Sequence, residues 1–351
     1  MKKLVNQFIK NLRKKSFEDS VVNLICFTIK KRYPDINSKK TLLPVIYASS
    51  MGITVTMSVK KLKRKGYEVH SNKTILDTIG NFNQDEINDI IFEIRKSVIG
   101  VAKRFDFCKR KTIVSIDLHD KPFYGDKTLA EVVGTKRKLG TNFAYRYATI
   151  CICEEGIRFN LATIAIGQRK LKKTLVRELI NLARKHVSIG LVLLDRGFNG
   201  VDVSRVLDEK RVKYIMPLVS NPKIQRVCDS SKKLDVMTYI YYEDRPKEYQ
   251  KKIRVIINKK GQGKHYFTTN IQGDSKTILA IIISAYNKRW GIETGYRVAD
   301  EFYAWTTSVR FSIRSFLGLL SFVMQDLWTL YNFLEQKETR MHQPRNRLLK
   351  L

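Results

Sequence analysis

The amino-acid sequence predicts an α/β fold, a mixed β-sheet flanked by helices, with a β-rich insertion and a helical N-terminal region. Residues 111–167 contain three β-branched or aromatic runs separated by turn residues, which is typical of strands. Residues 189–195, IGLVLLD, form a continuous apolar run of the kind expected for a strand buried on both faces. Residues 85–105 carry apolar side chains at helical spacing, with acids in the first turn.

Helices and strands alternate along the middle of the chain. The three strand-like runs are followed by a helix at 171–188, the strand at 189–195, a second helix and a last strand that ends at 219. This order is typical of an α/β layer with an antiparallel hairpin at one end. Residues 220–272 are polar and strand-like and form an insertion, after which the chain is helical again.

The chain carries far more positive than negative charge. Its 351 residues include 66 Lys and Arg against 33 Asp and Glu, which gives a formal net charge of +33. The 43% hydrophobic and 28% charged content is that of a folded protein. Because so much positive charge repels itself, a polyanionic partner is expected. Nucleic acid is the first candidate, and an anionic membrane surface is the second.

The basic residues are spread over the whole chain. Runs such as KKLKRKGY at 60–67 and GTKRKLG at 134–140 are interleaved with Tyr, Phe and Gly. One such run alone is usually a solvated face, but several favour an extended groove along a phosphate backbone. The most apolar stretch, FLGLLSFVM at 316–324, is too short to span a bilayer, which leaves nucleic acid as the expected partner.

The five cysteines predict neither a zinc site nor a disulfide framework. The one close pair, Cys151 and Cys153, lacks zinc-ligand spacing and has no His nearby. On a strand the two side chains would point to one face, as core residues. We therefore expect a reducing compartment.

Residues 54–80, TVTMSVKKLKRKGYEVHSNKTILDTIG, contain two short helical patterns around a Gly turn. One interpretation is a helix-turn-helix that binds DNA. The other is an ordinary pair of basic helices packed on the main domain. The pattern alone does not separate the two.

Two aspartates stand at the ends of apolar strands. Asp117 ends TIVSID and Asp195 ends LVLLD, and the carboxyl ends of strands are where open α/β sheets place their sites. A carboxylate there is costly unless it is hydrogen-bonded, paired or bound to metal. Taken singly, each aspartate fits a turn-initiating residue. As a pair on neighbouring strands of a strongly basic chain, they favour a metal site, because like charges this close need a cation between them.

The residue types favour two Mg²⁺ or Mn²⁺ ions. A pair of such ions, about 3.5–4 Å apart, would relieve the repulsion and support phosphoryl transfer. The ligands are oxygen atoms, and no His–Cys cluster points to Zn²⁺.

A segment at 285–302, AYNKRWGIETGYRVADEF, supplies a third carboxylate. At about 100° per residue, one face of a single helix carries Tyr286, Arg289, Glu293 and Arg297. Most polar stripes of this kind are solvated faces with i,i+4 pairs. This stripe combines the groups of a phosphate site, namely a metal-binding carboxylate, a guanidinium for phosphate oxygens and a phenol.

Three blocks in this order resemble the DDE transposases of prokaryotic insertion sequences. SIDLHDKPFYGD, with Asp117, and LLDRGF, with Asp195, resemble the two aspartate blocks of an archaeal branch of that superfamily. YNKRWGIE matches the first part of the branch's Tyr-x2-Arg-x3-Glu-x6-Lys signature through Tyr286, Arg289 and Glu293. The resemblance implies a ribonuclease H-like catalytic core and DNA transposition.

The resemblance covers roughly residues 110–335 and implies a role for each matched residue. The three carboxylates would hold two divalent ions that activate water, or later the DNA 3′-hydroxyl, and stabilise the leaving oxygen. Arg289 would hold a phosphate near the cut, and Tyr286 would contact or stack on the DNA. The signature's lysine is replaced by Asp300, so Arg297 or Arg310 is expected to take over its contact. Further DNA-binding candidates are Arg196, Lys136 and Arg137.

We accordingly divide the chain into five segments. They are a helical DNA-binding region at 1–108, the first part of the catalytic core at 109–219, the β-rich insertion at 220–272, the helical completion of the core with Glu293 at 273–336, and a basic tail at 337–351. The expected partners are double-stranded DNA, as element terminal inverted repeats and target, and a second copy of the chain in a dimeric end complex. The expected compartment is the prokaryotic cytoplasm, at the nucleoid, with no membrane.

Two alternatives share the same fold. One is an inactive or host-adopted DNA-binding relative, which would not nick DNA with a divalent metal. The other is a structure-selective nuclease, which would cut DNA without strand transfer.

Overall fold

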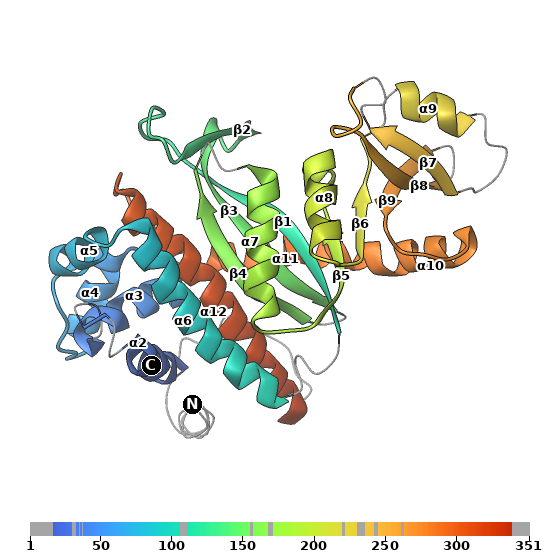
Figure 1. The fold of residues 1–351 in the computed structure, drawn as a ribbon. Helices are drawn as coiled ribbons and strands as arrows, with labels where there is room; N and C mark the ends of the chain where they lie inside the picture. Colours follow the sequence, from blue (N-terminus) through green and yellow to red (C-terminus); the bar gives the residue numbers. More distant parts are fainter. Residues whose placement is uncertain are drawn as a thin grey trace.

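The structure is a computed structural model that describes residues 17–29, 33–34, 36, 38–105, 111–154, 157–167, 171–219, 222–229, 236–241, 245–260 and 263–338 (Figure 1). The predicted basic tail lies outside the described residues from 339 onward. The predicted mixed sheet flanked by helices is confirmed. The predicted domain boundaries stay a prediction.

Nine strands of the described chain form one mixed sheet. They are β1 (Thr112–Pro122), β2 (Val132–Lys138), β3 (Thr141–Glu154), β4 (Ile157–Ile166), β5 (Ile189–Leu194), β6 (Tyr214–Pro217), β7 (Val236–Tyr241), β8 (Lys251–Lys260) and β9 (Gly263–Thr269). Their order is β2-β3-β1-β5-β6-β9-β8-β7, with β4 also paired to β3. β5 runs parallel to β1 and β6, and the other neighbouring strands are antiparallel.

The helices cover the sheet on both faces and continue into an N-terminal bundle (Figure 1). They are α2 (Phe17–Ile29), α3 (Lys39–Met51), α4 (Val55–Arg64), α5 (Asn72–Gly80), α6 (Gln84–Ala102), α7 (Lys172–Arg184), α8 (Val201–Glu209), α9 (Pro222–Asp229), α10 (Ser275–Tyr286), α11 (Gly291–Glu301) and α12 (Phe311–Glu338). Among the described residues, no single helix has the length and hydropathy to cross a membrane. The bent pair α3 and α4 meets that test only when the two are taken together.

β5 lies at the centre of the sheet and is buried on both faces. Val192 and Leu194 belong to the main hydrophobic core with α7 and α8. Leu191 and Leu193 point the other way, into a second cluster with α10. Because alternate side chains of a strand point to opposite faces, both sets must be apolar. The continuous apolar run in the sequence predicted this burial correctly.

The N-terminal helices begin at polar caps. Ser38, Thr54 and Ser71 each accept a backbone N–H of the helix that follows, α3, α4 and α5 respectively. At α6, Asn83 and Glu86 form a reciprocal capping box. Each cap satisfies an N–H that the first turn of a helix leaves without a partner, so these residues set where the helices start.

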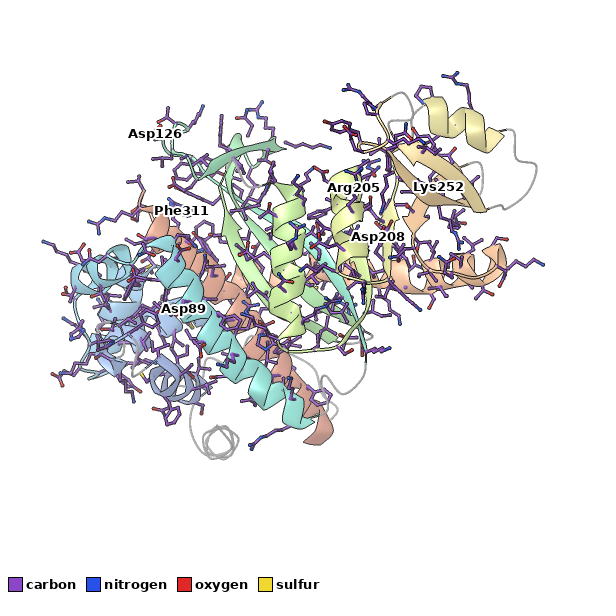
Figure 2. The ribbon with its side chains drawn as sticks, viewed as in Figure 1. Asp89, Asp126, Arg205, Asp208, Lys252 and Phe311 are labelled. Carbon is purple, nitrogen blue, oxygen red and sulfur yellow. The ribbon has the colours of Figure 1, made fainter. Side chains whose placement is uncertain are left out.

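The segment predicted as a β-rich insertion extends the main sheet. β9 pairs with β6, with Ile215 opposite Thr269, and β8 and β7 follow outward. Side chains of α8 face this segment (Figure 2). Asp208 pairs with Lys251, and the Arg205 guanidinium donates to the Gln250 carbonyl at 3.0 Å. The insertion is therefore anchored to α8 as well as to β6.

The prediction that Cys151 and Cys153 are core residues on a strand is confirmed. Cys151 and Cys153 are both buried on β3, and their sulfur atoms lie 3.5 Å apart. Cys26, Cys151 and Cys153 are free thiols.

α12 is the buried helix that joins the N-terminal bundle to the sheet, because it packs against both α6 and β4. Its Asp326 is fully buried and lies 3.5 Å from a guanidinium nitrogen of Arg95 in α6. The Asp326 Oδ1 accepts the backbone and side-chain N–H groups of Asn160 in β4, at 2.7 and 2.9 Å. Burial raises the pKa of Asp326 to about 7, against the opposing effects of Arg95 and Asn160. One buried ion pair thus links three elements.

Removing one partner of this pair should destabilise the protein more than replacing both. Arg95→Met leaves a buried carboxylate without a cation, which costs about 3–5 kcal/mol at pH 8. Arg95→Met with Asp326→Asn keeps an oxygen for Asn160 and removes both charges, so it should recover most of that loss. Denaturant unfolding of both variants measures the difference. Equal losses would show that the charge pair itself does not decide stability.

Candidate active site

The two predicted aspartates lie side by side on parallel strands. Ile116 of β1 is opposite Leu194 of β5, so the residues that follow, Asp117 and Asp195, are neighbours at the ends of the paired region. The sequence predicted that the first strand ends at Asp117, but β1 does not end there. It continues to Pro122, because its other edge stays paired with β3. Asp117 is therefore held by strand pairing on one side and faces Asp195 on the other.

The segment with Tyr286, Arg289 and Glu293 is not the single helix that the sequence predicted. α10 ends at Tyr286, a 3₁₀ turn spans Asn287–Trp290, and α11 starts at Gly291. A Cβ on Gly291 would lie 1.6 Å from the Arg158 side chain of β4, so a larger residue there would require that side chain to move. The break lets α11 begin in close contact with the sheet.

Arg289 lies between the three carboxylates. One guanidinium nitrogen is 3.2 Å from Asp117 Oδ2. The other is 3.8 Å from Asp195 Oδ1 and 3.7 Å from Glu293 Oε1. The Arg289 side chain is only 7% exposed, and the Tyr286 ring centre lies 5.4 Å from its guanidinium carbon. The structure thus brings together the five residues that the sequence singled out as the centre of the site.

The carboxylates differ in their environment. Asp117 is the most buried of the three, with a side chain 15% exposed, against 43% for Asp195 and 42% for Glu293. Burial raises the pKa of Asp117 from 3.8 to about 6. The N–H of Leu118 and the Arg289 guanidinium oppose this shift, while the two other carboxylates add to it. Asp117 is therefore the group whose ionisation depends most on a neighbouring cation.

Arg289 and Tyr286 both keep their protons in this acidic environment. Burial alone would lower the pKa of Arg289, but Tyr286 and the three carboxylates raise it overall. Burial raises the pKa of Tyr286 to about 12, so its phenol stays neutral and can donate a hydrogen bond. Arg289 is a permanent positive charge at the point where three carboxylates converge.

The donor set suits a hard divalent cation. All three side chains offer carboxylate oxygens, which Mg²⁺ and Mn²⁺ prefer. Among the described residues, no group of three or more His, Cys, Asp or Glu is spaced as a formed metal site. The three carboxylates face the Arg289 guanidinium, which lies where they converge. The oxygen ligands fit the ions, and in this structure the three carboxylates surround the Arg289 guanidinium; we call this group the arginine-centred cluster.

Asp300, which stands at the signature's lysine position, binds β1. Its Oδ1 accepts from His119 Nε2 at 2.8 Å and forms an ion pair with Lys121. The His119 ring also packs against the Tyr296 ring of α11, with ring centres 4.5 Å apart. Although burial opposes it, the contacts with His119 and Lys121 lower the pKa of Asp300 to about 2. Asp300 thus holds the end of α11 to the strand that carries Asp117.

Sequence analysis missed Lys121, and its signal was available. Asp117, His119 and Lys121 alternate along β1, so all three side chains point to the face that α11 covers. The Lys121 ammonium also lies 4.5 Å from the centre of the Tyr303 ring. If the strand had been predicted to continue beyond Asp117, the alternation of side chains along it would have placed Lys121 beside the site.

The other predicted DNA-binding residues lie at the surface. Arg297 of α11 is exposed, and Arg310 pairs with Asp77 of α5 at 3.3 Å. Arg196 is exposed directly after Asp195. Lys136 and Arg137 are exposed on β2. None of these five contacts the three carboxylates in the described structure, and their roles stay predictions.

Comparison with known proteins found one matching family and a structure with a similar fold. Residues 161–324 match the family described as Transposase DDE domain. The matched range includes Asp195 and Glu293 and begins after Asp117. The fold is similar to the cryo-EM structure of the piggyBac transposase synaptic complex with hairpin DNA, with a TM-score of 0.52 and 12% identity over 93% of this chain and 74% of that one. No curated protein matches the sequence. The family match covers less than half of the chain, and at 12% identity the structural similarity is one of fold.

Asp117→Asn should stabilise the metal-free protein at high pH. Because folding raises the pKa of this carboxyl from 3.8 to about 6, its ionisation costs stability that is absent below pH 4 and fully felt above pH 6. The variant should gain up to about 3 kcal/mol at pH 8 in EDTA, and the gain should vanish towards pH 4. Denaturant unfolding at several pH values measures this. Asp195→Asn, which changes a more exposed carboxylate, is the control and should gain less. A less stable Asp117→Asn at pH 8 would contradict the account.

Asp300→Lys should weaken the site rather than restore a lost contact. It would place a third basic group beside His119 and Lys121, so we expect Tm to fall by about 1–2 °C, the effect of roughly 1 kcal/mol in a chain of this size. Asp202→Lys, a charge reversal at an exposed ion pair of α8, is the control and should change Tm less. If Asp300→Lys is as stable as the parent and cuts DNA faster, Asp300 has no structural role and a phosphate-binding lysine serves better at this position.

Proposed function

We propose that this chain is the transposase of a prokaryotic insertion sequence. It would cut the ends of the element and join them to target DNA by phosphoryl transfer with two divalent ions. One observation carries the proposal. Three carboxylates, two from parallel strands and one from a helix, converge on a single buried arginine within a chain that matches the transposase DDE domain.

Asp117, Asp195 and Glu293 would hold the ions, either Mg²⁺ or Mn²⁺. When bound, the ions supply Lewis acidity and lower the pKa of water, which makes it a nucleophile at neutral pH. Asp117 sits on a strand paired on both edges up to that point, so it is the rigid ligand. Asp195 and Glu293 are more exposed, so they would be the ligands nearer to incoming DNA.

Arg289 would have two partners in turn. Without divalent ions, its guanidinium balances the charge of three carboxylates. When a phosphodiester reaches the site, the same guanidinium is suited to its oxygens, because it donates several hydrogen bonds in one plane. Tyr286, whose ring lies beside it, would contact the DNA next to the scissile phosphate. The Tyr-x2-Arg-x3-Glu signature then has one physical role, which is to join phosphate binding to metal binding.

The remaining parts of the proposal follow from charge and from the reaction. A net charge of +33 suits duplex DNA, both the terminal inverted repeats and the target. Two ends must be cut together, so a homodimer is the proposed active form. The proposed compartment is the prokaryotic cytoplasm.

The proposal is tested by DNA nicking and strand transfer with purified protein and supercoiled plasmid. Asp195→Asn and Glu293→Gln should each lower Mg²⁺-dependent nicking by more than about 100-fold, because a lost metal ligand removes several kcal/mol of transition-state stabilisation. Asp202→Asn, the same change at an exposed site on α8, should leave it unchanged.

The outcomes separate the alternatives. Nicking that persists in Asp195→Asn would refute the metal site. Nicking without joined products at any stage would instead indicate a nuclease. Binding without nicking by the unmodified protein would indicate an inactive relative.

A further inference from the structure

α3 and α4 meet at a sharp angle across a short turn. Their axes are bent by 109°, and three residues separate them. Gly52 begins the turn in the left-handed region, at φ 60° and ψ 39°, and its N–H bonds to the Ala48 carbonyl. A Cβ at Gly52 would also lie 3.0 Å from the carbonyl oxygen of Glu301. Helices that meet at about 90–120° across a turn of three or four residues, often with Gly, are the geometry of a helix-turn-helix.

α4 has one buried face and one outward face. Its buried residues are Val55, Ser58, Val59 and Leu62. The Ser58 hydroxyl donates to the Pro44 carbonyl of α3 at 2.6 Å, which fixes the two helices against each other. The outward stripe follows the i, i+3, i+4, i+7 spacing of one helical face and consists of Met57, Lys60, Lys61 and Arg64. α4 is thus a short helix that presents one apolar and three basic side chains together.

The charge of this stripe is not balanced by acids of the described chain. α4 itself contains no Asp or Glu. Within the described residues, Lys60, Lys61 and Arg64 form no ion pair, whereas nearby Lys40 pairs with Glu68. Met57 is 49% exposed at the N-terminal end of this stripe. An anionic partner with an apolar patch fits both features.

The turn between α3 and α4 is attached to the segment that follows α11. The hydroxyl of Ser49 donates to the Phe302 carbonyl, and the N–H of Trp305 donates to the Ile53 carbonyl at 3.2 Å. At the next helix, α5, the Gly80 carbonyl accepts from the Ser312 hydroxyl at 3.2 Å. α11 carries Glu293, so these bonds hold α4 at a fixed distance from the carboxylates.

We propose that α3 and α4 form a helix-turn-helix in which α4 binds the major groove of duplex DNA. The sequence pattern at 54–80 placed the possible pair one helix later, at α4 and α5. The major groove, about 12 Å wide, admits one α-helix and displays guanine acceptors and thymine methyl groups. Lys60, Lys61 and Arg64 match the acceptors and phosphates, and Met57 matches the methyl groups. The proposal rests on the proposed function and adds the element that reads DNA sequence.

The rigid attachment gives the proposal a consequence for cutting. If α4 binds a given set of base pairs, the bonds to residues 301–312 set how far the cut lies from them. The protein would then cut DNA at a fixed distance from the base pairs that α4 binds.

The test is selection of DNA by the full chain from a library of duplexes with a randomised centre, in EDTA so that no cutting occurs. The variants are Lys60→Ala/Lys61→Ala/Arg64→Ala and Met57→Ala. The matched control is Lys213→Ala/Lys247→Ala/Lys276→Ala, which removes the same charge from exposed positions at the other end of the molecule. Circular dichroism verifies that each variant is folded.

We expect the unmodified protein and the control to enrich the same sequence. The α4 triple variant should bind that sequence at least about tenfold more weakly. Its log–log salt slope should be shallower by about 2–3, since each lost phosphate contact contributes about 0.9. Met57→Ala should change the preferred bases with little change in the slope, because it removes no charge.

Two results would overturn the proposal. One is an α4 triple variant that enriches the same sequence with the affinity of the unmodified protein. The other is an unmodified protein that enriches no sequence, since α4 would then contribute charge alone. Mg²⁺-dependent nicking is measured separately, so a protein that selects DNA through α4 but never nicks it refutes the proposed function and not the helix-turn-helix.

Discussion

Repulsion among the carboxylates of Asp117, Asp195 and Glu293 is the constraint on which this molecule depends. Three acids converge at the centre of a sheet, and the Arg289 guanidinium is the cation that keeps them there. Burial raises the pKa of Asp117, and the nearby carboxylates of Asp195 and Glu293 add to that shift. A site of this kind is stable only with a positive charge inside it. This property is the reason for our proposal that the site binds divalent ions and phosphate.

The rest of the fold holds these four side chains in place. Parallel pairing of β1 with β5 sets the two aspartates side by side, and antiparallel pairing with β3 fixes β1 from its other edge. α11 is held to β1 by Asp300 and to the sheet by the close approach of Gly291 to Arg158. α12 then connects this region to the N-terminal helices through the buried pair of Asp326 and Arg95. The sheet and the N-terminal helices share one hydrophobic core.

Local patterns predicted the fold class and the residues of the site, and contacts distant in sequence decided what they missed. The apolar run before Asp195 predicted a strand buried on both faces, because that property depends on the strand's own side chains. The break between α10 and α11 was missed because the spacing of Tyr286, Arg289 and Glu293 is compatible with one continuous helix. The sequence showed Asp300 only as the residue that replaces the signature lysine, whereas the structure pairs it with His119 and Lys121. Helical spacing places a residue on a face but does not say which strand covers it.

The central claim is that the arginine-centred cluster is a divalent-metal site. Anomalous scattering from crystals of the full chain grown with Mn²⁺ tests it most directly. The account predicts manganese bound to carboxylate oxygens of Asp117, Asp195 and Glu293, with the Arg289 guanidinium moved from between them. Manganese absent from this position, with Arg289 still in contact with all three carboxylates, would contradict it.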